Sequence, residues 1–316
     1  MTGSGTPGTT RRPGRVIASH GRHVVVEAQT GERIPCTVRG RRLQIVCGDD
    51  VEWEPDTMPD KGIVLERLPR RSALARTNSA GAAETLVANI TQVVVLCAPQ
   101  PAPDFFIVDR YLAAAELLDL KSAIVWNKCE LSPSDDPARV ELEAYARAGY
   151  RVLECSTRTG AGIDRVQELL GDEISVLVGQ SGVGKSSLAN RLMPGLEVAT
   201  AELSRATEEG RHATSVSTLH HLPGGGDLLD SPGVRDFAPA IELLGDPARA
   251  FREITAVAPA CRFSDCKHQR EPACAVQAAV AAGGISPRRY ESYRRLKRLS
   301  EELAPDPGRA RRDRDR

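Results

Sequence analysis

Residues 179–186, with the sequence GQSGVGKS, have the residue types and spacing of a loop that binds phosphate groups. An apolar strand-like run, ISVLV, precedes the loop, and a helical pattern follows it. Glycines allow backbone N–H groups to face phosphate oxygens beside the helix N-terminus. Lys185 is expected to reach the β- and γ-phosphates, and Ser186 to ligate Mg²⁺. The nucleotide-binding residues predicted for this P-loop are Gly179, Gln180, Ser181, Gly182, Val183, Gly184, Lys185, Ser186 and Ser187.

Two further segments could select the base of the nucleotide. Asn127-Lys128-Cys129-Glu130 follows the apolar run SAIVW, and Ser156-Thr157-Arg158 follows YRVLEC. GTPases read guanine with an Asn-Lys-x-Asp segment and a Ser-Ala-x loop, in which the carboxylate accepts hydrogen bonds from guanine N1 and N2. Here the acid is one methylene longer than Asp, so the strictness of guanine selection stays open. The residues predicted to bind the base are Asn127, Lys128, Glu130, Ser156 and Thr157.

The order of these motifs along the chain is unusual. Asp230-Ser-Pro-Gly233 matches an Asp-x-x-Gly segment, whose Asp holds Mg²⁺ through water and whose Gly amide meets the γ-phosphate. Ordinary GTPases run from the P-loop through a switch threonine and Asp-x-x-Gly to the two guanine segments. Here the guanine segments come first, and residues 210–214 (GRHAT) occupy the switch position. Because strand ends build such a site in space, a parallel sheet tolerates this order, and we predict a circularly permuted GTPase.

A second chemical site is predicted from three cysteines and one histidine in the pattern Cys261-x4-Cys266-x-His268-x5-Cys274. Three thiolates and one imidazole form the ligand set of a tetrahedral structural zinc. A closed set of four ligands leaves no position for a substrate, so we expect one structural Zn²⁺ per chain. The alternative is a group of buried cysteines with a chance histidine.

The elements that must position these residues follow from hydrophobic patterning. Short β runs broken by glycines fill residues 15–69 and predict a small Greek-key barrel, of OB-fold or SH3-like type. These runs are RVIAS, HVVVEA, ERIPCTV, LQIVC, DDVEW and GIVLERL. From about residue 85, buried-strand runs alternate with helical patterns at 104–119, 136–148, 162–170 and 184–193, which predicts a parallel sheet with helices on both faces.

The chain is therefore predicted to have three folded parts. They are an N-terminal β-barrel (OB-fold), a central α/β P-loop GTPase fold with circularly permuted motif order, and a C-terminal, mainly helical zinc-binding domain. The predicted boundaries are a disordered tail at 1–13, an OB-fold RNA-binding domain at 14–72, the GTPase domain at 73–247, the zinc-binding domain at 248–306 and a second disordered tail at 307–316.

Composition and charge limit the class of protein. The 316 residues hold 42 basic and 42 acidic side chains, yet the net charge is +3 for residues 1–75, −8 for 76–284 and +5 for 285–316. Basic ends suggest contact with a polyanion such as nucleic acid, although solvated tails would give the same pattern. No apolar run is long enough to cross a membrane, and none follows the first arginines. We expect a cytoplasmic protein with no membrane partner.

The chain resembles the ribosome small-subunit-dependent GTPase A (RsgA, or YjeQ) family of bacteria over nearly its whole length. The resemblance implies a GTPase that uses GTP and Mg²⁺, binds the 30S ribosomal subunit (16S rRNA) late in its maturation, and is stimulated by that subunit. The phrases that carry it are GDDVEW (48–53), VANITQVVVL (87–96), GQSGVGKSSLAN (179–190), GRHATS (210–215), DSPGVRDF (230–237) and CRFSDCKHQREPACAV (261–276).

The resemblance also assigns the hydrolytic residues. No glutamine follows Gly233, where Val234 stands, so another group must position the attacking water. In the family, a histidine is proposed to position this water, and it corresponds to His212. The switch threonine that contacts Mg²⁺ corresponds to Thr214, because Ala213 replaces the first of the family's two threonines. The predicted catalytic residues are therefore His212, Lys185 and Thr214, and the predicted magnesium ligands are Ser186, Thr214 and Asp230.

Two other functions stay open at this point. One is an ATP-using P-loop enzyme such as a small-molecule kinase, which would lack the two guanine segments. The other is a non-catalytic RNA-binding scaffold with a vestigial nucleotide site, which a turnover assay would distinguish. One nucleotide site per chain requires no dimer, so we expect a monomer. The expected RNA contacts are the barrel and the basic helix at 288–298, through Arg288, Arg289, Arg294, Arg295, Lys297 and Arg298.

Overall fold

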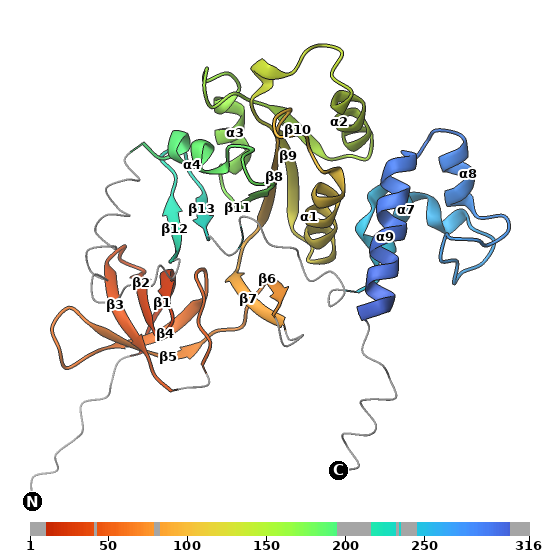
Figure 1. Ribbon diagram of the computed structural model, residues 1–316. Helices are drawn as coiled ribbons and strands as arrows, with labels where there is room; N and C mark the ends of the chain where they lie inside the picture. Colours follow the sequence, from red (N-terminus) through yellow and green to blue (C-terminus); the bar gives the residue numbers. More distant parts are fainter. Residues whose placement is uncertain are drawn as a thin grey trace, which may run out of the picture.

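The computed structural model describes residues 11–40, 43–78, 83–194, 216–231, 234 and 245–303. They form a barrel of strands, a sheet covered by helices and a helical C-terminal part, which follow one another along the chain (Figure 1). Among the helices described, none combines the length and the apolar composition that a membrane crossing requires.

The N-terminal part is a closed five-stranded barrel. Its strands pair in the order β1-β2-β3-β5-β4, and β4 pairs again with β1. This closure is that of an OB-fold, so the OB-fold prediction is confirmed over the SH3-like alternative. The barrel encloses its own core, which includes Val16, Val26, Trp53 and Val64. The strands are β1 (Arg12–His20), β2 (His23–Ala28), β3 (Arg33–Val38), β4 (Asp50–Pro55) and β5 (Gly62–Arg67).

Two sequence predictions for the barrel are wrong in detail. Strand β1 begins at Arg12, which pairs with Trp53 of β4, so Arg12 and Pro13 belong to the barrel and not to a disordered tail. The run LQIVC (43–47) is not a strand, because its backbone lacks strand pairing although part of it is buried. Burial in an irregular loop produces the same apolar pattern as burial in a short strand.

A hairpin that the sequence did not predict, formed by β6 (Ala73–Thr77) and β7 (Ala83–Ala88), joins the barrel to the central sheet. At this joint Gly48 has φ +91°, and a Cβ atom there would lie 2.0 Å from the carbonyl oxygen of Ala88. The side-chain amide of Asn89 donates to the carbonyl oxygen of Gly48 (2.9 Å). Fully buried Asp49 accepts two hydrogen bonds from Arg70, of 2.6 and 2.8 Å. The segments GDDVEW and VANITQVVVL are therefore in contact, and they connect the barrel to the central sheet.

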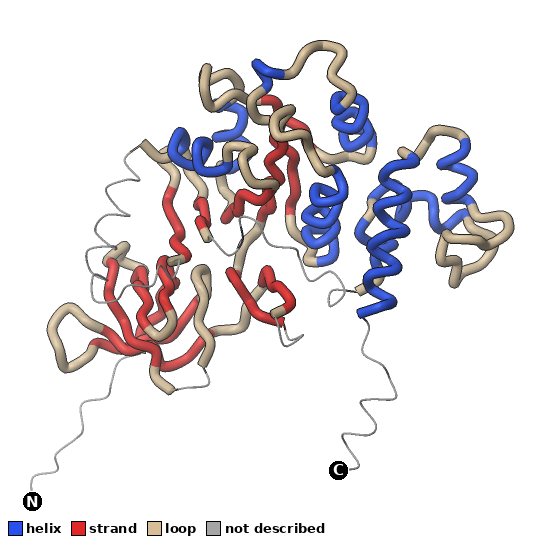
Figure 2. The backbone as a smooth tube through the Cα atoms, viewed as in Figure 1, coloured by secondary structure: helices blue, strands red, loops and turns tan. Residues whose placement is uncertain are grey.

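The central part is a sheet with the order β10-β9-β8-β11-β13-β12. All of these strands are parallel except β12, which is antiparallel to β13. Strand β12 also pairs with β1 of the barrel, Ala18 opposite Thr218, so one continuous sheet runs through both parts (Figure 2). The strands are β8 (Gln92–Cys97), β9 (Lys121–Trp126), β10 (Arg151–Glu154), β11 (Ile174–Gly179), β12 (Ser217–His221) and β13 (Asp227–Asp230).

Helices cover both faces of this sheet, as predicted. Along β8, Val93 and Val95 pack into a core with α1 and α2, while Val94 and Leu96 pack into a second core with α3 and α4. This alternation follows from the period of two along a strand. The helices are α1 (Phe105–Leu117), α2 (Ala138–Arg147), α3 (Ile163–Leu170) and α4 (Lys185–Leu192). Because β8, β9, β10, β11 and β13 are parallel, the described segments that follow β9, β10 and β11 lie at the same, carboxyl edge of the sheet, together with Asp230 at the end of β13.

The C-terminal part packs against the outer side of α1. Ala113 and Ala114 of α1 share a core with Phe251, Ile254 and Tyr293, and α9 lies beside α1 (Figure 1). Its elements are η3 (Pro247–Ala250), α7 (Arg252–Val257), η4 (Ala258–Ala260), α8 (Ala275–Ala281) and α9 (Pro287–Leu303).

A buried ionic cluster fixes this docking. Asp109 of α1 is 1% exposed and accepts hydrogen bonds from Arg288 (2.6 Å) and Arg289 (2.7 Å) of α9 and from the hydroxyl of Tyr145 (2.6 Å). Arg289, also 1% exposed, pairs with Glu253 of α7 as well. The prediction that Arg289 contacts RNA is therefore wrong, because its guanidinium group is buried and paired with carboxylates inside the protein. Arg288 also pairs with Asp109 but is 25% exposed, so its contact with RNA stays a prediction.

Candidate functional site

The P-loop, residues 179–186, connects β11 to α4 at the carboxyl edge of the sheet. Gly179, Gly182 and Gly184 have φ values of +140°, +81° and +98°, which residues with side chains rarely adopt. A Cβ atom at Gly179 would lie 2.1 Å from the carbonyl oxygen of Leu96, at the end of β8. The curled conformation of the loop therefore depends on glycine at these positions.

Lys185 begins α4, and its side chain turns back over the P-loop. The ammonium group donates to the carbonyl oxygens of the first two residues of the loop, at 2.7 and 2.9 Å, and the residue is 8% exposed. Lys185 and Asp230, which ends β13, line one small pocket, and Ser186 and Ser187 are exposed in the first turn of α4. An ammonium group, a hydroxyl and a carboxylate beside one helix N-terminus fit the phosphates and Mg²⁺ of a nucleotide.

The predicted base-reading segment is hydrogen-bonded directly to the P-loop. Asn127 is fully buried: its Nδ2 donates to the carbonyl oxygen of Val183 (2.9 Å), and its Oδ1 accepts from the backbone N–H of Thr157 (3.2 Å). The Nζ of Lys128 donates to the carbonyl oxygen of Gly182 (2.8 Å). These two side chains bring together the three segments that the sequence analysis assigned to one nucleotide.

Glu130 lies in the short helix η1 (Cys129–Leu131). Its Oε1 is 3.1 Å from Nε of Arg158, while its Oε2 is buried and accepts no hydrogen bond from the described residues. The pKa of Glu130 is lowered, chiefly by the hydroxyl of Ser156 acting against the cost of burial, and further by Arg158. The carboxylate is therefore ionised at neutral pH.

Three predicted residues, His212, Thr214 and Gly233, lie outside the described residues, so their roles stay predictions. Val234 is described: it is 2% exposed and belongs to the hydrophobic core beneath α1. The side chain that follows the Asp-x-x-Gly segment is therefore apolar and packed into the interior.

The loop 98–104, which follows β8, also contacts the predicted nucleotide-binding segments, although the sequence analysis did not assign it to the site. The carbonyl oxygen of Gln100 accepts from Nζ of Lys128 (2.7 Å), and the backbone N–H of Asp104 donates to Oε1 of Gln180 (3.0 Å). Gln180 thus bonds the P-loop to the N-terminal end of α1 through its side chain. The loop has no motif of its own, so its position follows only from the topology of the sheet.

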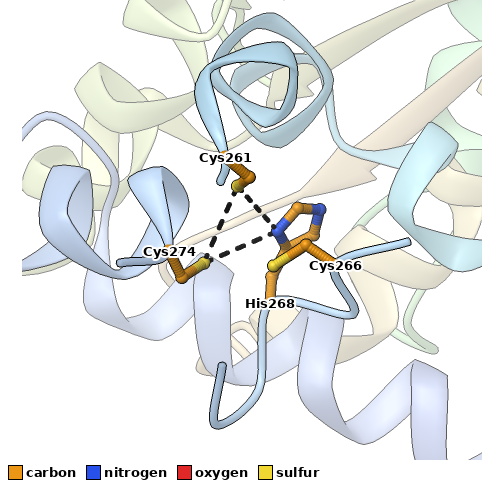
Figure 3. Close-up of side chains that lie close together, drawn as sticks. All are labelled: Cys261, Cys266, His268 and Cys274. Carbon is orange, nitrogen blue, oxygen red and sulfur yellow. Dashed lines mark hydrogen bonds between the residues drawn. The ribbon is translucent and has the colours of Figure 1, made fainter. Parts of the chain in front are cut away.

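The four predicted zinc ligands, Cys261, Cys266, His268 and Cys274, point toward one another (Figure 3), and their ligand atoms all lie within 4.8 Å. Nδ1 of His268 is 3.5 Å from Sγ of Cys261 and 3.6 Å from Sγ of Cys274, and these two sulfurs are 3.9 Å apart. Bonds of about 2.3 Å to sulfur and about 2.0 Å to nitrogen place the corners of a tetrahedron roughly 3.5–3.8 Å apart. The donor set and its spacing therefore fit zinc.

Hydrogen bonds support the loop of predicted zinc ligands from two sides. The carboxylate of Glu271 accepts from three backbone N–H groups of residues 267–270, at 2.8–2.9 Å. Although burial opposes it, these bonds lower the pKa of Glu271 to about 2. From α9, the hydroxyls of Tyr290 and Tyr293 donate to carbonyl oxygens of the same loop, at 2.5 and 2.6 Å. The sequence analysis did not assign Glu271, although it is the single acid between the last two ligands.

The chain also resembles known proteins. The family model described as RsgA GTPase matches residues 67–239. Proteins named small ribosomal subunit biogenesis GTPase RsgA, from Azotobacter vinelandii and Pseudomonas aeruginosa, are 40% and 39% identical to it over 289 and 285 residues. Each of these matches covers 90% of this chain and 84% of the relative.

Two solved structures share the fold. The crystal structure of YjeQ from Thermotoga maritima has a TM-score of 0.71 and 31% identity, covering 94% of this chain and all of that one. YloQ, described as a circularly permuted GTPase, has a TM-score of 0.71 and 25% identity, covering 94% of this chain and 97% of that one. With a family model over more than half of its length and relatives matched along 90% of it, the chain belongs to the RsgA GTPase family and is a GTP hydrolase with circularly permuted motifs.

Proposed function

We propose that this GTPase binds the 30S ribosomal subunit and assists the late stage of its maturation, hydrolysing GTP to GDP and phosphate with stimulation by the subunit. The observation that carries the nucleotide part is the bonding of Asn127 and Lys128 to Val183 and Gly182, because it unites a base-reading segment with a phosphate loop. The name of the relatives, small ribosomal subunit biogenesis GTPase, supports the subunit as partner.

In this proposal the nucleotide lies along the carboxyl edge of the sheet. Guanine would be held by Asn127, Lys128, Glu130, Ser156 and Thr157, and the phosphates by the P-loop and Lys185. Mg²⁺, with Ser186, Thr214 and Asp230 as its ligands, would neutralise charge on the phosphates. His212 would position the attacking water, because Val234 has no polar side-chain atom and is packed inside the protein.

We further propose that Cys261, Cys266, His268 and Cys274 hold one structural Zn²⁺. The loop that carries these ligands has few apolar residues of its own, so metal binding would supply the folding free energy that a hydrophobic core supplies elsewhere. The four ligands form a closed set, which supports a structural role.

The ribosome-facing surface is proposed to include the barrel and the exposed side of α9. Within α9, Arg294 and Arg298 are exposed and share Glu291 as a partner, whereas Arg288 and Arg289 pair with buried Asp109. Contacts to phosphates release counterions, so affinity for the subunit should fall steeply as salt rises. A salt-independent affinity would indicate protein contacts instead. Because its proposed partner is cytoplasmic, we propose a cytoplasmic location, and one site per chain supports a monomer.

The experiment that tests this function is GTP hydrolysis by the full chain with and without purified 30S subunits. Stimulation by 30S and not by 50S subunits is the expected result. Absence of turnover in both conditions would favour the non-catalytic scaffold. ATP binding as tight as GTP binding would refute the guanine assignment, because a site that pairs with the polar edge of a base rejects analogues by up to about 10⁴-fold.

A further inference from the structure

We propose that Arg158 is a positioning residue for guanine recognition, which holds the carboxylate of Glu130 in the orientation that accepts hydrogen bonds from the base. This inference rests on the proposed function, because it concerns the same nucleotide site. It assigns a role to the third residue of the Ser156-Thr157-Arg158 loop, whose first two residues alone were predicted to contact the nucleotide.

The first observation is the geometry of the pair. Nε of Arg158 lies 3.1 Å from Oε1 of Glu130, and the side chains are 70% and 16% exposed respectively. The other oxygen of Glu130, Oε2, is buried and accepts no hydrogen bond from the part of the chain that the structure describes. One oxygen is therefore held by a cation from the solvent side, and the other carries no hydrogen bond from the described residues.

The second observation is that both residues lie on backbone segments that are bonded to each other. The N–H of Cys129 donates to the carbonyl oxygen of Cys155 (3.1 Å), and the N–H of Thr157 donates to Oδ1 of Asn127 (3.2 Å). Within the second loop, the N–H of Thr159 donates to Oγ of Ser156 (3.0 Å). The carboxylate and the guanidinium group thus project from one cross-linked frame.

The physical need for such a residue comes from the length of the Glu130 side chain. Glutamate has one more rotatable bond than aspartate, so its carboxylate loses more conformational freedom when it is fixed on a base. A guanidinium group that already bonds Oε1 removes part of this freedom before the nucleotide binds, which improves affinity by preorganisation. Arg158 also favours the ionised carboxylate, and an ionised carboxylate only accepts hydrogen bonds.

The exposure of Arg158 decides where its effect is measured. Ion pairs between exposed side chains contribute little to folding stability, because water and salt screen them. We therefore expect the Arg158→Ala variant to keep the melting temperature of the wild type. Its effect should appear in discrimination at the 2-amino group of guanine, which a residue with a merely structural role would not change.

The test compares GDP with IDP, which lacks the 2-amino group, by calorimetry on the full chain. In the wild type, GDP should bind more tightly than IDP. In Arg158→Ala, we expect GDP affinity to fall roughly 1.5- to 5-fold, the range of an exposed ion pair, and IDP affinity to fall less, so that the IDP-to-GDP ratio of dissociation constants decreases. Arg165→Ala, which removes an exposed arginine of α3, is the matched control and should leave both affinities unchanged.

A second background separates positioning from direct contact with the nucleotide. In Glu130→Asp, the carboxylate is one methylene farther from Arg158, so adding Arg158→Ala should change GDP affinity less than 2-fold. An equal loss in both backgrounds would overturn the proposal, since Arg158 would then act on the nucleotide itself. An unchanged ratio in Arg158→Ala would overturn it as well. A wild type that binds ADP as tightly as GDP would instead refute the proposed guanine site, and with it this role.

Discussion

A Cβ atom at Gly184 would lie 2.3 Å from Nδ2 of Asn127, the side-chain amide that bonds the predicted base-reading segment to the P-loop. No real Cβ atom approaches an amide nitrogen so closely, so the glycine and the asparagine fix each other's place. The P-loop glycine thus serves two purposes: its φ of +98° curls the loop, and its missing side chain makes room for Asn127.

Gly184→Ala should therefore weaken nucleotide binding, and GTP turnover should fall by about 10²-fold, because displacement of a positioning group by about 1 Å costs a reaction that much. The measurement is GDP binding by calorimetry, with a melting curve to confirm the fold. Gly283→Ala is the matched control: Gly283 also has a positive φ, +77°, but nothing lies within 4 Å of its Cβ position. It should cost only the backbone strain of about 1–2 kcal/mol and leave GDP affinity unchanged.

The motifs of this site could be predicted from sequence, whereas the bonds among them could not. Gly179–Ser186 and the four predicted metal ligands are short, local patterns with fixed spacing, and strand-helix alternation was sufficient to place the P-loop at a sheet edge. The bond between Lys128 and Gln100 joins segments that carry no mutual signal along the chain. This bond forms because β8 and β9 are parallel neighbours in the sheet, and their pairing is a property of the three-dimensional structure.

The basic helix at 288–298 shows a different limit of prediction from sequence. A run of arginines has the same composition whether it faces RNA or carboxylates, and the partner Asp109 lies 180 residues from Arg289 along the chain. The hairpin of β6 and β7 was missed because its strands, ALART and AETLVA, are rich in alanine and poor in the β-branched and aromatic residues that mark strands.

Arg289→Ala should destabilise the docking of the C-terminal part on α1. It leaves Glu253 without its arginine and buried Asp109 with Arg288 as its remaining cationic partner. Breaking a buried pair costs roughly 3–5 kcal/mol. Urea denaturation should show this loss, or an early separate transition of the C-terminal part. Arg294→Ala removes an exposed partner of Glu291 and should change stability by less than about 0.5 kcal/mol. Equal effects of the two substitutions would contradict the importance of the buried cluster.

Cys266→Ser should remove the zinc while leaving the nucleotide site intact. Metal analysis should give one zinc per wild-type chain and a large loss in the variant, and limited proteolysis should then cleave within residues 255–280. GDP affinity should stay within 2-fold of the wild type. Cys36→Ser, in the barrel, is the control that should retain its zinc. A wild-type protein without zinc would refute the site.

His221 should make the contact between barrel and sheet depend on pH. Its Nε2 is 2.9 Å from Glu27 of β2 and its Nδ1 is 2.6 Å from Asp227 of β13. Although burial lowers the pKa of His221, these two carboxylates raise it above its usual value. A raised folded-state pKa gives stability that is fully present below about pH 6.5, the unfolded value, and is lost as pH rises through the folded value.

The measurement is the free energy of unfolding of wild type and His221→Gln from pH 5.5 to 9. The wild type should be the more stable protein at pH 5.5, and the difference should shrink toward pH 9. His23→Gln, at an exposed histidine of the barrel, should show no such trend. A difference that grows with pH would mean that the neutral imidazole is the stabilising form.

His212 is the last residue on which the mechanism depends. Transfer of a phosphoryl group to water requires the nucleophile in line with the leaving group, and positioning is most of the catalysis available. Val234, at the position of the usual glutamine, is packed in the hydrophobic core and cannot hold a water molecule at the γ-phosphate. A neutral imidazole in the 210–214 segment could accept a hydrogen bond from that water.

His212→Ala should keep the affinity for a non-hydrolysable GTP analogue and for 30S subunits, yet lose the stimulated turnover by roughly 10²-fold or more, as expected for a positioning group. Turnover with and without 30S subunits separates this role from two others. A variant that hydrolyses GTP at the stimulated wild-type rate would show that the subunit or the switch backbone places the water. A variant that also loses analogue binding would show that His212 maintains the nucleotide site itself, because a group that acts only on the water has no effect on the affinity for an analogue that cannot react.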